Sequence, residues 1–394
     1  MKKSISLIAI ILSLCFLTPS FAQKKTDEKS AKSATIKVKR NNSNKFGYVD
    51  ENGKEVIAAK YDNAREFAEP NGLAPVCIGC DFTGAKRGGK WGYINIKGEE
   101  IIPLKYAQAY PFTSGVGRVR MTDTVCDNCM WGLVNRKGKE ITPFKYDEIK
   151  TPSEGFSVVC MGLGQKKPKF GIVDSLGKEI VPPIYKNIGT FKSGMCTVQS
   201  PTDGKWGYLN KKGEIAVPLT YQSCFPFSEN FACVSIKDSG ENKYGYIDTK
   251  GKEVIKCQFE SAGSFNNGLA KVKLNKKWTF INKSGKTISD YMYDLVMDFS
   301  GNNTFVKLNG KWGLIDKENK KVLDFKFDEA GSFYDGVSKV KINGKWGYID
   351  NAGKQIIECK YDKIEAFNFE NKARIFLDEK KGYVTYEGQE IWDK

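Results

Sequence analysis

The stretch KVKINGKWGYIDNAGKQIIECKYD, residues 339–362, contains the motif that decides the fold of this chain. Its Trp346-Gly347 pair is followed fifteen residues later by Tyr361, and the same spacing occurs in nine copies, with a tenth, shortened copy from Lys381-Gly382. The first aromatic residue of each copy, here called the lead aromatic, is Phe46, Trp91, Trp131, Phe170, Trp206, Tyr244, Trp278, Trp312 or Trp346. The partners fifteen residues on are Tyr61, Tyr106, Tyr146, Tyr185, Tyr221, Phe259, Tyr293, Phe327 and Tyr361. A fixed spacing repeated in this way predicts a tandem array.

Three runs within one copy have strand character, at residues 340–342, 346–349 and 354–357. Asn343-Gly344 between the first two runs is a strong signal for a tight hairpin. Asp350-x-x-Gly353 between the second and third is typical of a type I turn that glycine closes in the left-handed region. A three-stranded unit is marginally stable alone, so the copies must stack. The sequence therefore predicts an all-β array of about ten three-stranded antiparallel repeats.

The Asp-x-x-Gly turn recurs with the repeat. Four residues past the lead aromatic stand only Asp or Asn, and seven past it stands glycine in every copy except one, which has Asn319. Asn is the non-glycine residue that best tolerates positive φ, so a backbone requirement explains the whole set. A ladder of calcium-binding carboxylates is the alternative interpretation.

The recurring aromatic residues are expected to form the stacked core. Each aromatic side chain buries on the order of 150–250 Å², which a small repeat needs. The core residues predicted in this way include Trp91, Trp131, Trp206, Trp278, Trp312, Trp346, Tyr61, Tyr106, Tyr146, Tyr185, Tyr221 and Tyr361. A row of aromatic rings also suits sugar binding, which is the alternative interpretation.

The repeat resembles the WG-repeat family, whose name comes from its Trp-Gly pair. The resemblance is carried by the segments at 90–94 (KWGYI), 205–209 (KWGYL), 311–315 (KWGLI) and 345–349 (KWGYI), and it covers about residues 36–392. It implies a bacterial repeat protein, often exported, without a defined common activity and without catalytic residues. Both ends of the chain are in phase with the repeat, so we expect an open, curved, solenoid-like array. A closed β-propeller is the alternative.

The first residues have the pattern of a secretory signal peptide. Lys2 and Lys3 precede an apolar run, and Ser20-Phe21-Ala22 is a small-x-small cleavage site. We therefore assign 1–22 to a signal peptide, 23–33 to a linker and 34–394 to the repeat domain. A lipoprotein site at Cys15 is the alternative. The apolar run is too short to span a membrane, and the sequence predicts export to the periplasm, the cell surface or the medium.

Charge and composition limit the possible chemistry. The formal charge is +16, with lysines scattered through every repeat rather than gathered in an arginine-rich stripe. This pattern favours a solvated surface or an anionic partner over nucleic acid. The chain has no histidine, which removes Ser-His-Asp and Cys-His catalysis and histidine metal ligands. No cofactor is predicted.

Insertions concentrate between the first two strands of the early copies. They lie at residues 81–90, 121–130, 161–169, 201–205 and 237–243, and loops of this kind often build a binding face. Two of these tips carry the pairs Cys77-x-x-Cys80 and Cys126-x-x-Cys129. Disulfides are the interpretation we favour for an exported protein, and a Cys₄ zinc site and a redox motif stay open.

Three functional hypotheses follow. The first is a non-catalytic exported scaffold that binds a protein or an anionic envelope polymer. The second is a glycan-acting enzyme with two carboxylates in a cleft. The third is a redox protein that uses the CxxC motifs.

Overall fold

The computed structural model describes residues 36–68, 72–80, 89–121, 130–165, 167–368 and 370–393. The predicted signal peptide and linker, and both Cys126 and Cys129, lie outside these residues. Within them every regular element is a β-strand, and the strands form ten small antiparallel sheets that follow one another along the chain.

Each sheet is built from up to four kinds of strand, named here from one edge to the other. The inner strands are β4 (Asn63–Ala64), β8 (Gln108–Ala109), β11 (Glu148–Ile149), β15 (Asn187–Ile188), β19 (Ser223–Cys224), β23 (Ser261–Ala262), β26 (Leu295–Val296), β30 (Glu329–Ala330) and β34 (Lys363–Phe367). The second strands are β1 (Lys37–Arg40), β5 (Ala74–Ile78), β9 (Val116–Met121), β12 (Phe156–Met161), β16 (Met195–Gln199), β20 (Phe231–Asp238), β24 (Leu269–Leu274), β27 (Asn303–Leu308), β31 (Val337–Ile342) and β35 (Lys372–Leu377).

The lead strands carry the lead aromatic, and the outer strands carry its partner. The lead strands are β2 (Phe46–Val49), β6 (Lys90–Ile94), β10 (Met130–Asn135), β13 (Lys169–Asp174), β17 (Trp206–Asn210), β21 (Glu241–Asp248), β25 (Lys277–Asn282), β28 (Lys311–Asp316), β32 (Lys345–Asp350) and β36 (Lys380–Thr385). The outer strands are β3 (Glu55–Tyr61), β7 (Glu100–Tyr106), β14 (Glu179–Tyr185), β18 (Ile215–Tyr221), β22 (Glu253–Phe259), β29 (Lys321–Phe327), β33 (Gln355–Tyr361) and β37 (Glu390–Trp392).

The inner strand is an addition to the three strands that the sequence pattern predicted. Directly after Tyr61 the chain turns back, and Asn63 and Ala64 pair with Cys77 and Val76 of the next sheet. Seven of the ten described sheets are four-stranded for this reason. Because each inner strand belongs to the preceding copy, consecutive copies are interlocked by main-chain hydrogen bonds.

The glycine of the Trp-Gly pair makes room for a bulge in the outer strand. In the fifth copy Trp206 pairs with Tyr221, and Tyr208 pairs with Val217. An advance of two residues along the lead strand is thus matched by four residues of the outer strand, which bulges. A Cβ atom on Gly207 would lie 2.4 Å from the carbonyl oxygen of Val217, which is closer than such atoms approach. Glycine is therefore a steric requirement of the bulged pairing.

In the part of the chain that the structure describes, the third and seventh copies have no outer strand, although the third keeps its glycine as Gly132 and only the seventh has Thr279 in that place. In the seventh copy the isolated bridges at Trp278–Tyr293 and Ile281–Thr287 remain, and the third copy has the equivalent bridges at Trp131–Tyr146 and Val134–Glu140. The Thr279 hydroxyl donates a hydrogen bond to the Ser289 carbonyl oxygen at 3.0 Å.

A second tyrosine, two residues past the lead aromatic, forms the centre of the core in five copies. Tyr48, Tyr93, Tyr208 and Tyr246 have no exposed surface and Tyr348 has 5%. Each hydroxyl donates to the carbonyl oxygen seventeen residues later, for example Tyr208 to Phe225 at 2.8 Å. The apolar ring thus fills the space between sheets while its polar end is satisfied.

An acidic residue directly after the partner aromatic joins neighbouring sheets. Asp294 accepts from the Lys277 ammonium of its own copy at 2.5 Å and from the main-chain N–H of Gly310 in the next hairpin at 3.3 Å. The same double contact is made by Asp62, Asp328 and Asp362. The hydrogen bond from Lys277 is the main reason that the pKa of Asp294 is lowered.

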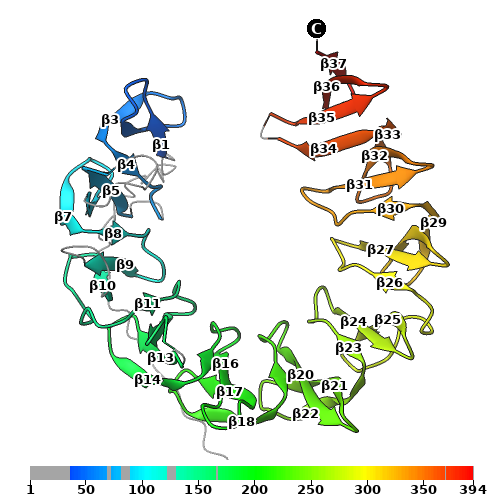
Figure 1. Ribbon diagram of the computed structural model, residues 1–394, viewed down its shortest axis with the longest axis horizontal. Helices are drawn as coiled ribbons and strands as arrows, with labels where there is room; N and C mark the ends of the chain where they lie inside the picture. The colour runs from blue at the N-terminus through cyan, green and yellow to red at the C-terminus, as the bar shows by residue number, and fades with distance from the viewer. Residues whose placement is uncertain are drawn as a thin grey trace, which may run out of the picture.

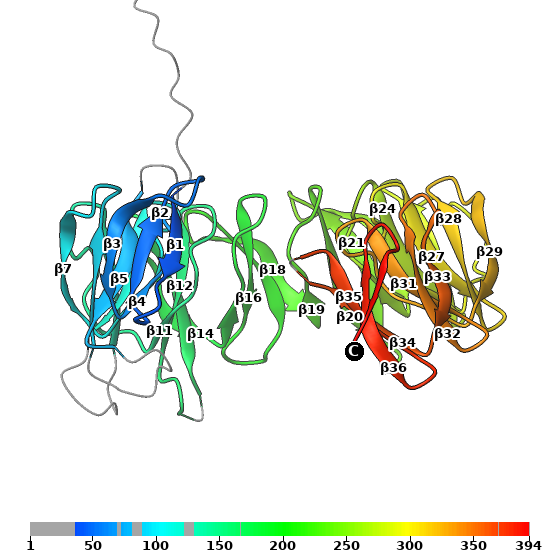
Figure 2. The same cartoon turned by 90° about the horizontal axis from the view of Figure 1, so that it is seen from above.

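The sheets follow an open arc. Figure 1 shows β1 and β37 at the two ends of a horseshoe, and the order β16, β17, β18 from the inside of the arc to its outside. Figure 2 shows the strands running across the thickness of the arc. The predicted open, curved array is confirmed, and the arc is not closed into a propeller ring.

Candidate functional site

The arc has two faces, because the strands run across its thickness. The hairpin face carries the hairpins between second and lead strands. The turn face carries the Asp-x-x-Gly turns and the links from inner to second strands. Topology places them at opposite ends of the strands, so the residues of one face share the same side of every sheet.

The predicted core aromatics divide into buried and half-buried groups. Trp91 and Trp312 are buried, as are Tyr61, Tyr106, Tyr146 and Tyr361. Half-buried are Trp131, Trp206, Trp278, Trp346, Tyr185 and Tyr221. Apart from Trp206, these rings pack in or against the apolar clusters of the core, and the half-buried group keeps part of its surface in solvent.

Basic side chains cover several of the tryptophan rings. The residue opposite the lead Trp on the second strand is a cation in four copies. Its charged group lies 5.1–5.9 Å from the ring centre in the pairs Arg120–Trp131, Lys273–Trp278, Lys307–Trp312 and Lys341–Trp346. Cation–π attraction favours these positions of the charged groups along the array.

Two arginines gather around one tyrosine near the beginning of the arc. The guanidinium carbons of Arg65 and Arg118 lie 4.2 and 4.6 Å from the centre of the Tyr110 ring. Arg118 also donates to the carbonyl oxygen of Ile149 at 2.8 Å. Among the described residues no carboxylate lies within 4.0 Å of either guanidinium group.

The first predicted cysteine pair is joined by a disulfide. Cys77 and Cys80 are bonded, with 6.1 Å between their Cα atoms, at the start of a hairpin tip. The described cysteines without a disulfide are Cys160, Cys196, Cys224, Cys233, Cys257 and Cys359. Burial raises the pKa of the Cys196, Cys224 and Cys233 thiols to about 12. These thiols are therefore protonated near neutral pH and behave as small apolar groups.

Apolar side chains are exposed on the hairpin face beside the predicted tips. They are Ile78, Met161, Leu163 and Ile236, all in the second, fourth and sixth copies. Residues 81–88, 122–129 and 166 of the predicted tips lie outside the described residues.

The recurring turn carboxylates accept main-chain hydrogen bonds. The Asp50 Oδ1 atom accepts from the N–H groups of Asn52 and Lys54, both at 2.9 Å. Asp174, Asp248, Asp316 and Asp350 repeat this arrangement, and Asn319 has the expected positive φ of 63°. The described residues contain no group of three or more Cys, Asp or Glu side chains placed to hold a metal ion.

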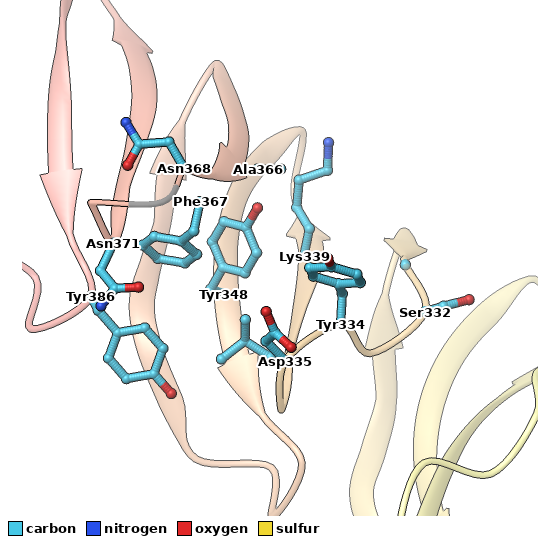
Figure 3. A pocket seen from close by; sticks show the side chains of 12 residues that line it. Ser332, Tyr334, Asp335, Lys339, Tyr348, Ala366, Phe367, Asn368, Asn371 and Tyr386 are labelled. Carbon is cyan, nitrogen blue, oxygen red and sulfur yellow. The ribbon is translucent and has the colours of Figure 1, made fainter. Parts of the chain in front are cut away.

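A pocket of about 330 Å³ lies between the last two sheets, toward the turn face. Figure 3 shows Tyr334, Asp335 and Lys339 on one side and Phe367, Asn371 and Tyr386 on the other, with Tyr348 between them. The Phe367 ring centre is 4.9 Å from that of Tyr348 and 5.6 Å from that of Tyr386. The pocket is thus lined by aromatic rings and bordered by polar and charged groups.

The pocket lies beside a local departure from the repeat. The inner strand β34 has five residues where the other inner strands have two. The spacing from the partner aromatic Tyr361 to the next lead position, Lys381, is one residue longer than the same spacing in the three preceding copies, which is 19 residues. That extra residue was visible in the sequence, but its spacing alone gave no reason to expect a pocket. The insertions in the sequence predicted a binding face at the early hairpin tips, and no sequence signal indicated this pocket.

The structure describes no helix long and apolar enough to cross a membrane. The described strands form an unclosed series of small antiparallel sheets, most of which have a bulge opposite the aromatic–glycine pair. This arrangement defines the class of all-β tandem-repeat proteins. A family model described as "WG containing repeat" matches residues 46–79, 91–124, 131–162, 170–205, 206–238, 244–278, 278–312, 312–346 and 346–380. The chain therefore belongs to the WG-containing repeat family.

Comparison with curated proteins found no match. Among solved structures, the chain is similar to a eukaryotic initiation factor, with 11% identity over 77% of this chain and 93% of that chain and a TM-score of 0.42. It is also similar to apo AztD from Citrobacter koseri, with 13% identity over 66% of this chain and 93% of that chain and a TM-score of 0.30. A third similar structure is the β-propeller domain of the Trilobed protease from Pyrococcus furiosus, with 11% identity over 67% of this chain and 95% of that chain and a TM-score of 0.29. Likeness at these TM-scores carries no argument about function.

Proposed function

We propose that this WG-repeat protein is an exported, non-catalytic scaffold that binds an anionic polymer of the cell envelope. One observation carries the proposal: the recurring carboxylates are used by the framework, whereas the chain has an excess of cations. The turn Asp residues accept main-chain N–H groups, and the Asp residues that join neighbouring sheets bind lysine and the next hairpin.

A third recurring carboxylate is also occupied. Glu140 accepts from the Lys105 ammonium at 2.8 Å and from the Tyr106 hydroxyl at 3.2 Å, and Glu179 and Glu390 repeat the contact. Acidic groups held in this way are poor candidates for a catalytic pair. Arg65 and Lys307 contact aromatic rings and have no ion pair among the described residues, so they are candidates for binding an anionic ligand.

Co-sedimentation of the mature chain with polygalacturonate, dextran sulfate and neutral dextran tests the proposal. We expect binding to the two anionic polymers that weakens steeply as salt shortens the range of electrostatic attraction, and much weaker binding to dextran that salt does not change. Arg65→Gln should weaken binding more than the control Arg374→Gln, because Arg374 is already paired with Asp393 at 2.5 Å. Equal binding to dextran, or release of shortened polymer chains, would refute the scaffold proposal.

A protein partner is the second candidate, and the hairpin face supports it. Ile78, Met161 and Leu163 expose 51%, 39% and 52% of their surface there, beside the insertions that set the early copies apart. A triple substitution of these residues by Ser should abolish capture of such a partner from envelope extracts and leave binding to the anionic polymers unchanged. The CxxC redox hypothesis has less support, because the Cys77–Cys80 disulfide lies on a strand and hairpin, without a helix N-terminus among the described residues to lower a thiol pKa.

A further inference from the structure

The pocket between the last two sheets contains polar groups that the fold does not use. The Tyr334 and Tyr386 hydroxyls, the Asp335 carboxylate, the Lys339 ammonium and the Asn371 amide make no side-chain hydrogen bond within the described residues. Tyr348 is different, because its hydroxyl donates to the Glu365 carbonyl oxygen at 2.9 Å. Five uncommitted donors and acceptors around one cavity indicate a ligand with many hydroxyl groups.

The aromatic surfaces of the pocket are also available. Tyr334 exposes 78% of its surface and Tyr386 exposes 37%, whereas the second tyrosines at the centre of the core are buried. The Lys339 ammonium lies 4.3 Å from the centre of the Trp346 ring, and this cation–π contact favours a position at the pocket edge while leaving its N–H groups free of side-chain hydrogen bonds within the described residues. A ligand that fits must therefore present both an apolar face and a polar rim.

A pyranose ring has these properties. Its axial C–H groups form apolar faces that stack on aromatic rings, and its equatorial hydroxyls donate and accept hydrogen bonds around the rim. A cavity of about 330 Å³ is at the small end of small-molecule sites, which range over roughly 300–1,000 Å³, and suits a single ring. A simple anion would use Lys339 but would be repelled by Asp335, and an apolar ligand would leave the polar groups unpaired.

We propose that this pocket binds one pyranose unit of a glycan, with the ring stacked on Tyr386 or Tyr334 and its hydroxyls bonded to Asp335, Asn371 and Lys339. The inference rests on the proposed function in one respect, namely that the envelope polymer is a glycan. It adds a site of defined chemistry on the turn face, at the opposite end of the strands from the predicted hairpin tips.

Saturation-transfer NMR with the methyl glycosides of glucose, galactose, N-acetylglucosamine and galacturonic acid tests this site on the mature chain. We expect at least one glycoside to bind with its ring protons, rather than its methyl group, closest to the protein. Tyr386→Ala should weaken that binding about tenfold through loss of one aromatic face. Tyr386→Phe should retain most of the stacking, and Asp335→Ala should weaken binding through the hydroxyl contacts.

The controls separate loss of the site from loss of the fold. Tyr386 packs on Phe367, so its truncation could loosen the last sheet, whereas the mostly exposed Tyr334 can be changed to Ala without that effect. Leu176→Ala, 82% exposed on the turn face of the fourth copy, should bind like the wild type. Binding of no glycoside, or wild-type binding by both Tyr334→Ala and Tyr386→Ala, would overturn the proposal. If salt-sensitive polymer binding persisted in that case, only the pocket proposal would fail.

Discussion

Gly207→Ala tests the steric explanation of the Trp-Gly pair. The added Cβ would lie 2.4 Å from the Val217 carbonyl oxygen and 2.7 Å from that of Pro218, and both are main-chain atoms of the bulged strand β18. Because no side chain can rotate away, β18 must move or detach. Overpacking of this kind costs typically 1–3 kcal/mol, and contact with main chain puts the expected cost at about 3 kcal/mol.

Hydrogen exchange read by mass spectrometry is the suitable assay, because a repeat array opens locally rather than in one step. If the free energy of local opening falls by about 3 kcal/mol, exchange of the β18 amides should speed up on the order of a hundredfold, with little change in copies eight and nine. Gly331→Ala is the matched control, since its Cβ would meet the nearest atom at an ordinary 3.6 Å and its φ is not positive. Unchanged exchange in β18, or an equal effect at Gly331, would refute the steric reasoning.

Four further outcomes are expected. Gly251→Val should lower the melting temperature, because a β-branched residue must adopt φ near 79° there and its Cβ would lie 2.9 Å from a Val217 methyl group. Trp312→Ala should cost about 3–5 kcal/mol locally, measured by exchange in the eighth sheet, since the ring is 8% exposed. Thermal stability should fall progressively below about pH 5, because the lowered pKa of Asp294 gives stability that is present above the unfolded-state pKa and is lost as pH drops through the folded-state pKa. Asp294→Asn should reduce that acid-dependent loss. The thiol of Cys196 should resist labelling in the native protein at pH 8 and react after denaturation, as peptide mapping would show.

The repeat and its turns could be predicted because they depend on local backbone conformation. Asn343-Gly344 has φ of 50° and 81°, as the tight hairpin requires, and Asn319 takes the place of a left-handed glycine. These requirements are encoded within four or five consecutive residues. They are therefore visible as recurring positions in the sequence.

The contacts between sheets could not be read in the same way. The acidic residue after the partner aromatic recurs in the sequence, but its function becomes visible only when the following hairpin is placed beside it, as for Asp294 and Gly310. The steric requirement at Gly207 likewise depends on a bulge in a different strand. The same holds for the candidate pocket, where Tyr334 and Tyr386 come from different sheets and meet only in three dimensions.

The open arc removes a condition that a ring imposes. In a closed ring, the rotation angles between successive sheets must add up to a full circle. Losing one unit therefore breaks the ring. Here the contacts described, such as Asp62 to Gly79 and Tyr106 to Glu140, join only neighbouring sheets. Whole units can therefore be duplicated or deleted by recombination without reshaping the others, and the reach of the arc grows in increments of one copy. The number of copies is thus a property that evolution or an engineer can vary independently of the fold.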